Sequence, residues 1–416
     1  MEPLNRFLAF DHLREVPRGI KKVAWSRTIR WIGWGFGESL IPIFLLSFSH
    51  SFTETGMLKS IYDVIFLVSL PVVSMFADEL SSKVLLVLAL VAYLFTGASY
   101  LFAGLTGLAL FIIIARGLNG LAWCLDTIGI DTYLRRSAGV HSEAAAFGYV
   151  ESLGNFGWLL AAIIGFFLIQ FVPIHWLLFM IVPTSLLAFL PILHLRDGKP
   201  NTTRAAHVFH SYQVFFEGMR TWHTGQYRAA WIALLISIVS TMSSFFLPIA
   251  AYENGANLQQ VILMTVIFTI PALGAWSIAN VVDRIDKHRA LIVLLATLPL
   301  SFLAVALMPS YEIEVLAAFV MQVIVVCVDL IVQAYITVIS PRQQYGSVTG
   351  AIDGIKEFGA MITPVIAGAV ADMAGLQGMF AVVCFVTIVT AAYVYHHPIS
   401  RRVPDEASLP PIMMLP

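Results

Sequence analysis

Ionisable side chains interrupt long apolar stretches of this sequence, and they are the residues whose chemistry is most specific. The stretch from Gly107 to Val172 contains two apolar runs that enclose Arg116, Asp126 and Glu151. A charged side chain in hydrocarbon costs several kcal/mol unless it is paired, hydrated or used. A carboxylate in a poorly hydrated cavity can also bind and release protons, because low polarity disfavours its charged form. The candidate chemistry is therefore proton transfer and the binding of charged groups.

Similar ionisable residues recur about 200 residues further along the chain, which indicates an internal repeat. The offset that aligns Glu151 with Asp353 also places Asp329 one position from the counterpart of Asp126. The glycines on either side of Glu151 and Asp353 keep the same spacing in both copies. The chain therefore contains two related halves, each with acids inside its apolar runs.

The composition identifies the environment that these residues occupy. Apolar residues make up 59% of the 416 residues and charged residues only 12%, whereas a soluble protein carries about 25% charged residues. Apolar runs of roughly 20 residues, long enough to cross ~30 Å of hydrocarbon, recur from end to end. Inside a bilayer the backbone must satisfy its own hydrogen bonds, and runs of this length do so as helices. We therefore predict an all-α membrane protein.

We predict twelve transmembrane helices in two groups of six. The first group occupies residues 31–194 and the second occupies residues 229–396. Residues 1–30 form a cytoplasmic arm and residues 397–416 form a cytoplasmic tail. Between the groups, residues 195–228 form a cytoplasmic connector with an amphipathic helix on the membrane surface.

Lys and Arg residues define the predicted orientation. All but three of the 24 Lys and Arg residues fall in the arm, the connector, the tail or the loops on that same side. The three exceptions lie within spans: Lys59, Arg116 and Lys356. Because positive charge accumulates on the cytoplasmic side, we expect both termini in the cytoplasm and the protein in the inner, plasma membrane.

Three short segments carry a resemblance to a known family. An acid is followed by a basic residue between the second and third predicted helices, from Asp78 to Lys83, and again at Asp283 and Arg284 between the eighth and ninth. Within the fourth predicted helix, Arg116 precedes a glycine. With its repeated halves, the chain resembles the major facilitator superfamily over essentially its whole length.

This resemblance implies two pseudo-symmetric six-helix halves that alternate access to a site between them near the middle of the membrane. It implies a monomer. By analogy with the family motifs, Asp78, Asp283 and Arg284 would close the cytoplasmic gate through ion pairs. The resemblance also associates Arg116 with proton coupling.

We assign proton coupling to Arg116, Asp126 and Asp329. Arg116 lies near mid-membrane, about 14 Å from the outer surface at 1.5 Å per residue. Neither acid has a basic residue within one turn of its own helix. Side chains that we assign to the substrate cavity carry charge within other spans: Glu38, Asp353, Lys356 and Glu357.

Several of these residues also have a structural interpretation. Lys356 can neutralise Asp353 one turn before it, and Lys59 can neutralise Asp63 on the same face of the second helix. Alternatively, Asp63 is a contact of the outer gate. A structural arginine that binds helix carbonyls remains an alternative for Arg116.

These features predict a secondary active transporter that moves a small organic solute by alternating access, coupled to protons or to Na⁺. Export of amphiphilic compounds by proton antiport is the nearest alternative. A membrane-embedded enzyme is disfavoured because no metalloprotease, hydrolase or phosphate-binding motif occurs; a non-transporting receptor on a carrier fold is a further alternative. We expect a small-molecule substrate and membrane lipids as partners. We expect no nucleic acid, cofactor or metal, since the net charge is −1 and the three cysteines are far apart.

Overall fold

The computed structural model describes residues 17–137, 143–195, 222, 224–274, 278, 281–282, 284–339 and 345–397. The predicted amphipathic helix of the connector and most of the predicted arm and tail lie outside these residues. Every regular element within them is a helix.

The first half of the chain forms six membrane passes, of which the first and the sixth are built from shorter helices. The elements in order are α3 (Arg18–Gly35), η1 (Glu38–Leu40), α4 (Ile41–Leu46), α5 (Phe52–Glu79), α6 (Ser82–Thr106), α7 (Ala109–Ser137), α8 (Glu143–Leu168), α9 (Ile174–Phe179) and α10 (Ile181–Leu193).

The second half repeats this order, with a seventh pass that is again built from several pieces. Its elements are α12 (Thr224–Thr241), η2 (Met242–Phe246), α13 (Leu247–Glu253), α14 (Leu258–Leu273), α16 (Lys287–Leu307), α17 (Tyr311–Ile339) and α18 (Tyr345–His396). α18 contains two passes, because Gly375 at its centre has φ 73° and ψ 169°. A positive φ of this kind is sterically unfavourable for a residue that has a side chain, whereas glycine adopts it without strain.

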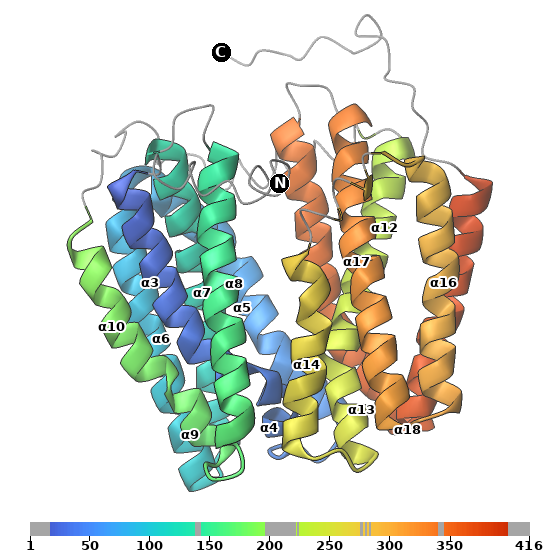
Figure 1. Ribbon diagram of the computed structural model, residues 1–416, viewed down its shortest axis with the longest axis horizontal. Helices are drawn as coiled ribbons and strands as arrows, with labels where there is room; N and C mark the ends of the chain where they lie inside the picture. The colour runs from blue at the N-terminus through green and yellow to red at the C-terminus, as the bar shows by residue number, and fades with distance from the viewer. Residues whose placement is uncertain are drawn as a thin grey trace, which may run out of the picture.

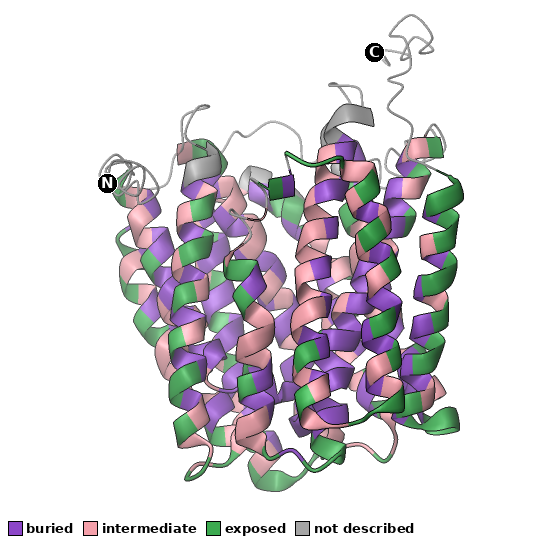
Figure 2. Cartoon of the chain, turned by 45° about the vertical axis from the view of Figure 1, so that its right-hand side comes forward, coloured by how far each residue is buried: buried purple, intermediate pink, exposed green. Residues whose placement is uncertain are grey.

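The helices of the described ranges account for the predicted number of passes. Ten of them are long and apolar enough to cross a membrane, and α14 is a shorter apolar helix. One of the ten, Gly350–His396, is long enough for the two passes on either side of Gly375. Figure 2 shows buried residues inside the bundle and exposed residues on its outer faces. The prediction of twelve helices in two halves is confirmed.

The first helix begins at Arg18 rather than at residue 31. The sequence predicts residues 18–30 as part of the cytoplasmic arm, and this segment contains Arg27 and Arg30. Both are buried within the bundle, with exposed fractions of 6% and 2%. Acids from other helices compensate their charge, as described below, and this compensation is invisible to a prediction based on one segment.

Figure 1 shows the two halves as two bundles side by side, with α5 between them. We call the end of the protein at which Arg18, Lys83 and Arg284 lie the basic end. The end at which Ser51 and Gly107 lie is the opposite end. In Figure 1 the bundles lie close together at the opposite end and farther apart at the basic end.

Contacts between the halves concentrate on α5 and α18 near the opposite end. The Asp372 carboxylate accepts hydrogen bonds from the backbone N–H groups of Phe52 and Thr53, at 2.8 and 2.9 Å. A Cβ atom on Gly56 would overlap backbone atoms of Pro364, and one on Gly368 would overlap those of Phe52. Glycine therefore permits the close approach of α5 and α18, and the protein is closed at the opposite end.

A second contact between the halves lies beside the first. The Gln259 amide of α14 donates to the Phe166 carbonyl of α8 at 3.0 Å. Gln259 follows the start of α14 and Phe166 precedes the end of α8, so this contact also belongs to the opposite end.

Candidate functional site

The first pass is irregular where its candidate residue lies. After α3, Gly37 adopts φ −136° and ψ −7°, a 3₁₀ turn covers Glu38–Leu40, and Pro42 lies in the first turn of α4. Proline cannot donate the hydrogen bond that would continue the helix. Irregular backbone at membrane depth is tolerated where it is buried in protein or lines a water-filled cavity.

The seventh pass is irregular at the position that the repeat makes equivalent. A π-helix covers Met242–Phe246, and Pro248 follows in α13. Ser244 is exposed there, although nearly all of its neighbours are buried. Both irregular helices therefore present polar groups at similar levels of the bundle.

Glu38 is the most accessible acid of the first half at this depth. It is exposed, whereas the following residues Ser39 and Leu40 are buried. The Trp158 indole Nε1 of α8 donates a hydrogen bond to Glu38 Oε2 at 2.6 Å. A carboxylate that is fixed on one side and open on the other is suited to bind a solute. This placement is consistent with its predicted place in the cavity.

Asp126 is buried between α7 and α3 of the first half. It pairs with Arg30 of α3 through two hydrogen bonds, one to each carboxylate oxygen. The side chains are only 2% and 1% exposed, and the guanidinium lies 5.3 Å from the centre of the Tyr93 ring. This geometry favours a structural role for Asp126, since its charge is already compensated within the first half.

Glu151 forms a similar but more open pair. Arg27 Nη2 lies 2.7 Å from Glu151 Oε1, with side-chain exposures of 7% and 48%. The Arg27 guanidinium also lies 5.1 Å from the centre of the Trp31 ring. Both arginines of α3 therefore connect it to neighbouring helices of the same half.

Arg116 is buried and connects α7 with α5. Its Nη2 donates to the Lys59 carbonyl at 3.0 Å, and its guanidinium lies 4.9 Å from the centre of the Tyr62 ring. These contacts match the structural alternative stated for Arg116. They also place a positive charge beside the Lys59–Asp63 pair.

Lys59 and Asp63 form the pair expected from their spacing. Lys59 Nζ lies 2.6 Å from Asp63 Oδ2, and the Asp63 side chain is 3% exposed. One turn away, the Ser60 hydroxyl donates to the Met361 carbonyl of α18 at 2.6 Å. The pair therefore lies where α5 meets the second half, as a contact of the gate would.

In the second half, Lys356 and Asp329 form an accessible ion pair. Lys356 Nζ lies 2.6 Å from Asp329 Oδ1, and the side chains are 27% and 37% exposed. Asp353, one turn before Lys356, is exposed, and Glu357 is half-buried. The partner of Lys356 is thus an acid on the neighbouring helix α17, and sequence spacing alone suggested Asp353.

The predicted cytoplasmic gate is described only in part. Asp78 lies in the last turn of α5, and its side chain is outside the described residues, as is Asp283. Arg284 is exposed in the turn before α16. At the end of α5, Arg136 of α7 donates to the Ala77 carbonyl at 2.8 Å.

Asp372 is a contact that sequence reasoning missed. Besides the two backbone N–H groups at the start of α5, its carboxylate accepts a hydrogen bond from the Thr53 hydroxyl at 2.5 Å. The carboxylate thus compensates the positive N-terminal end of α5. The sequence does show an acid just before Gly375. It contains no indication that the partner of this acid lies 320 residues away.

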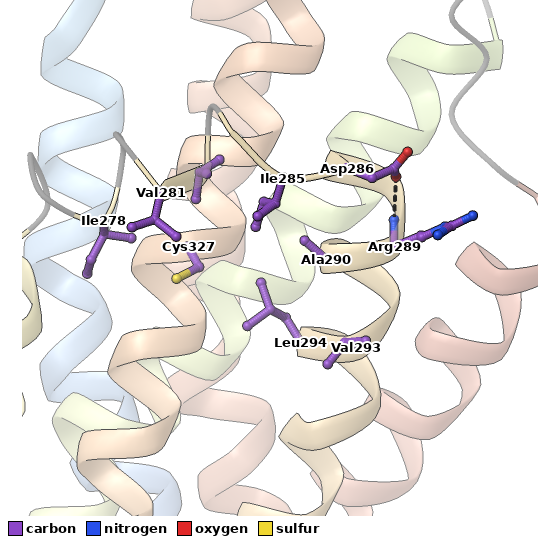
Figure 3. A pocket seen from close by; sticks show the side chains of 10 residues that line it. Ile278, Val281, Ile285, Asp286, Arg289, Ala290, Val293, Leu294 and Cys327 are labelled. Atoms are coloured by element: carbon purple, nitrogen blue, oxygen red, sulfur yellow. Dashed lines mark hydrogen bonds between the residues drawn. The ribbon is translucent and has the colours of Figure 1, made fainter.

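A separate apolar groove of about 750 Å³ lies at the basic end of the second half. Figure 3 shows Val281, Ile285, Val293 and Cys327 along it, with Asp286 accepting a hydrogen bond from the Arg289 backbone N–H at its edge. None of the predicted site residues lines this groove. In the described parts of the chain, no group of His, Cys, Asp and Glu side chains could hold a metal ion.

Comparisons with known proteins agree with this geometry. The Major Facilitator Superfamily profile matches residues 23–321 and 229–411, and no curated protein matches the chain. The solved nucleoside transporter NupG is similar at a TM-score of 0.75 and 14% identity, covering 91% of this chain and 98% of its own.

Two further structures show the same fold. The D-xylose-proton symporter gives a TM-score of 0.70 at 11% identity, with 92% of this chain and 99% of its own covered. An inward-facing bacterial homologue of the lysosomal transporter Spinster gives 0.69 at 12%, with 91% and 95% covered.

The chain belongs to the Major Facilitator Superfamily. It is a multi-pass membrane transporter with two six-helix halves, as the sequence predicted. The family consists of transporters, so the alternative of a membrane-embedded enzyme is excluded.

Proposed function

We propose that the chain is a proton-coupled secondary active transporter of a small polar organic solute, which binds between Glu38 of the first half and the Lys356–Asp329 pair of the second. The observation that carries this proposal is the exposed, Trp158-bound carboxylate of Glu38 at the break of the first helix. A charge at that depth would otherwise cost several kcal/mol.

The candidate polar groups of the two halves lie at neighbouring levels of the bundle. Glu38 lies eight residues from the end of α4 and Ser60 lies eight residues from the start of α5, so both lie at a similar level. Ser60 contacts Met361, and Lys356 precedes Met361 by five residues, or about 7.5 Å along the helix. Glu38 and Lys356 therefore lie at levels about 7.5 Å apart along the bundle axis.

Hydrogen-bonding chemistry narrows the class of solute. Glu38, Asp329 and the exposed Ser244 supply acceptors for hydroxyl groups, and Lys356 supplies a donor. The solved relatives described by their solute carry a nucleoside or a sugar. We therefore propose a nucleoside-like or sugar-like solute.

The closed opposite end supports the proposed direction of access. Because Lys and Arg gather at the basic end, we place this end, and both termini, in the cytoplasm. Contacts of Asp372, Ser60 and Gln259 close the halves at the other end. The protein is then closed on the side away from the cytoplasm.

Uptake into proteoliposomes tests the proposal. Purified protein would first be screened by thermal shift against nucleosides and sugars, and the compounds that stabilise it would be used radiolabelled. We expect accumulation under an inward proton gradient and a strong loss with Glu38→Gln. Glu312→Gln, which removes an exposed acid at the opposite end, is the matched control. Binding without flux would instead indicate a receptor, and proton-driven dye extrusion without uptake would indicate export.

A further inference from the structure

The contact between α5 and α18 follows one regular register. Phe52 lies opposite Gly368, Gly56 opposite Pro364 and Ser60 opposite Met361. The two helices are antiparallel. One turn along α5 toward the basic end therefore corresponds to one turn along α18 toward its first residue.

One more turn of this register brings acids of the two halves together. Residues 63 and 64 of α5 then face residue 357 of α18. Glu357 accordingly interacts electrostatically with Asp63 and Lys59 across the boundary between the halves. Two carboxylates thus lie near one lysine where the halves meet, and Arg116 lies on the first-half side of that lysine.

The other charged groups around Glu357 have partners of their own or are themselves negative. On its own helix, Lys356 is already paired with Asp329 of α17, and Asp353 adds a negative charge. On the first half, Lys59 is paired with Asp63, while Arg116 binds the Lys59 carbonyl and faces the Tyr62 ring. An ionised Glu357 would therefore repel Asp63 across the boundary between the halves.

We propose that Glu357 is the proton-binding residue that couples protonation to closure of the opposite end. With Glu357 protonated, α5 and α18 pack as observed and the protein is open at the basic end. Loss of the proton restores the repulsion with Asp63 and favours separation of the two helices. A proton that binds from the opposite side and leaves at the basic end would then drive movement of solute in the same direction.

This inference rests on the proposed proton coupling, but it assigns the binding of the proton to Glu357 rather than to the ion pairs described above. Arg116, Asp126 and Asp329 are all engaged within one half. Glu357 faces a titratable group of the other half, so its environment changes when the halves move.

Double electron–electron resonance on the full chain tests the inference without a known solute. Spin labels attached through an encoded ketone amino acid at exposed positions 108 and 308 report on the opposite end. Labels at exposed positions 84 and 285 report on the basic end. From about pH 5 to about pH 8, we expect the 108–308 distance to lengthen and the 84–285 distance to shorten. For one proton, the ratio of the two populations changes at most about tenfold per pH unit.

Glu357→Gln should show the short 108–308 distance and the long 84–285 distance of low pH at every pH. Glu357→Asp should retain the change of both distances with pH if the variant folds. Lys59→Gln should raise the long 108–308 population at a given pH. Glu312→Gln is the control and should follow the wild type.

If the distances in Glu357→Gln change with pH as they do in the wild type, the assignment is overturned. It is also overturned if the wild-type distances do not change with pH, or if Glu312→Gln loses the pH dependence to the same extent as Glu357→Gln. Size-exclusion profiles separate these outcomes from misfolding. Solute uptake that is indifferent to a proton gradient would instead contradict the proposed coupling itself.

Discussion

Replacing Asp126 by asparagine would leave the Arg30 guanidinium buried without a counter-charge. Both side chains are at most 2% exposed and share two hydrogen bonds. Removing one partner of such a buried pair costs about 3–5 kcal/mol. The corresponding change at the Arg27–Glu151 pair, Glu151→Gln, should cost less than Asp126→Asn, because the Glu151 side chain is 48% exposed and water reaches its side of the pair.

A double-mutant cycle measures this difference. Unfolding in detergent would be followed by tryptophan fluorescence for Asp126→Leu, Arg30→Met and the Arg30→Met/Asp126→Leu double variant, which together close the cycle, and for Asp126→Asn beside them. The double variant should recover most of the lost stability, because replacing both charges by apolar groups is often neutral or stabilising. A loss below about 1 kcal/mol for Asp126→Asn, or additive effects in the cycle, would refute the structural role of this pair.

Three further predictions concern the contacts between the halves and the turn in α18. Gly56→Leu should prevent α5 from approaching the Pro364 backbone, so the 108–308 distance should be long at all pH values; an unchanged short distance would contradict the role of this glycine. Asp372→Ala should weaken the same closure by removing the acceptor of the α5 N-terminus, and labels at that end should report a larger open population than in Glu312→Gln. Gly375→Ala should cost roughly 1–3 kcal/mol in unfolding free energy, because φ 73° with ψ 169° is a backbone conformation that essentially only glycine adopts, although an added Cβ atom would meet only the Gln377 side chain.

Much of the fold was predictable because membrane helices carry a strong local signal. Apolar runs gave the number of passes, and the repeat of Glu151 and Asp353 indicated two halves. The predicted start of the first helix was wrong, because the charges of Arg27 and Arg30 are compensated by partners on other helices. Acids of distant segments supply those partners, and a single segment contains no information about them.

The candidate site was predictable only where chemistry depends on spacing along one helix. Lys59 and Asp63 form the expected pair. The partner of Lys356 proved to be Asp329 rather than Asp353, since the choice depends on which face of α18 meets α17. The meeting of Asp63 and Glu357 depends on the register of α5 and α18, and this register exists only in three dimensions.

Uptake of a radiolabelled nucleoside or sugar into proteoliposomes tests the central claim most directly. The wild-type protein should concentrate the solute under an inward proton gradient, a protonophore should abolish accumulation, and Glu38→Gln should lose uptake. If the wild type binds the solute but never moves it across the membrane, or if Glu38→Gln transports it as well as the wild type, the account of this site is contradicted.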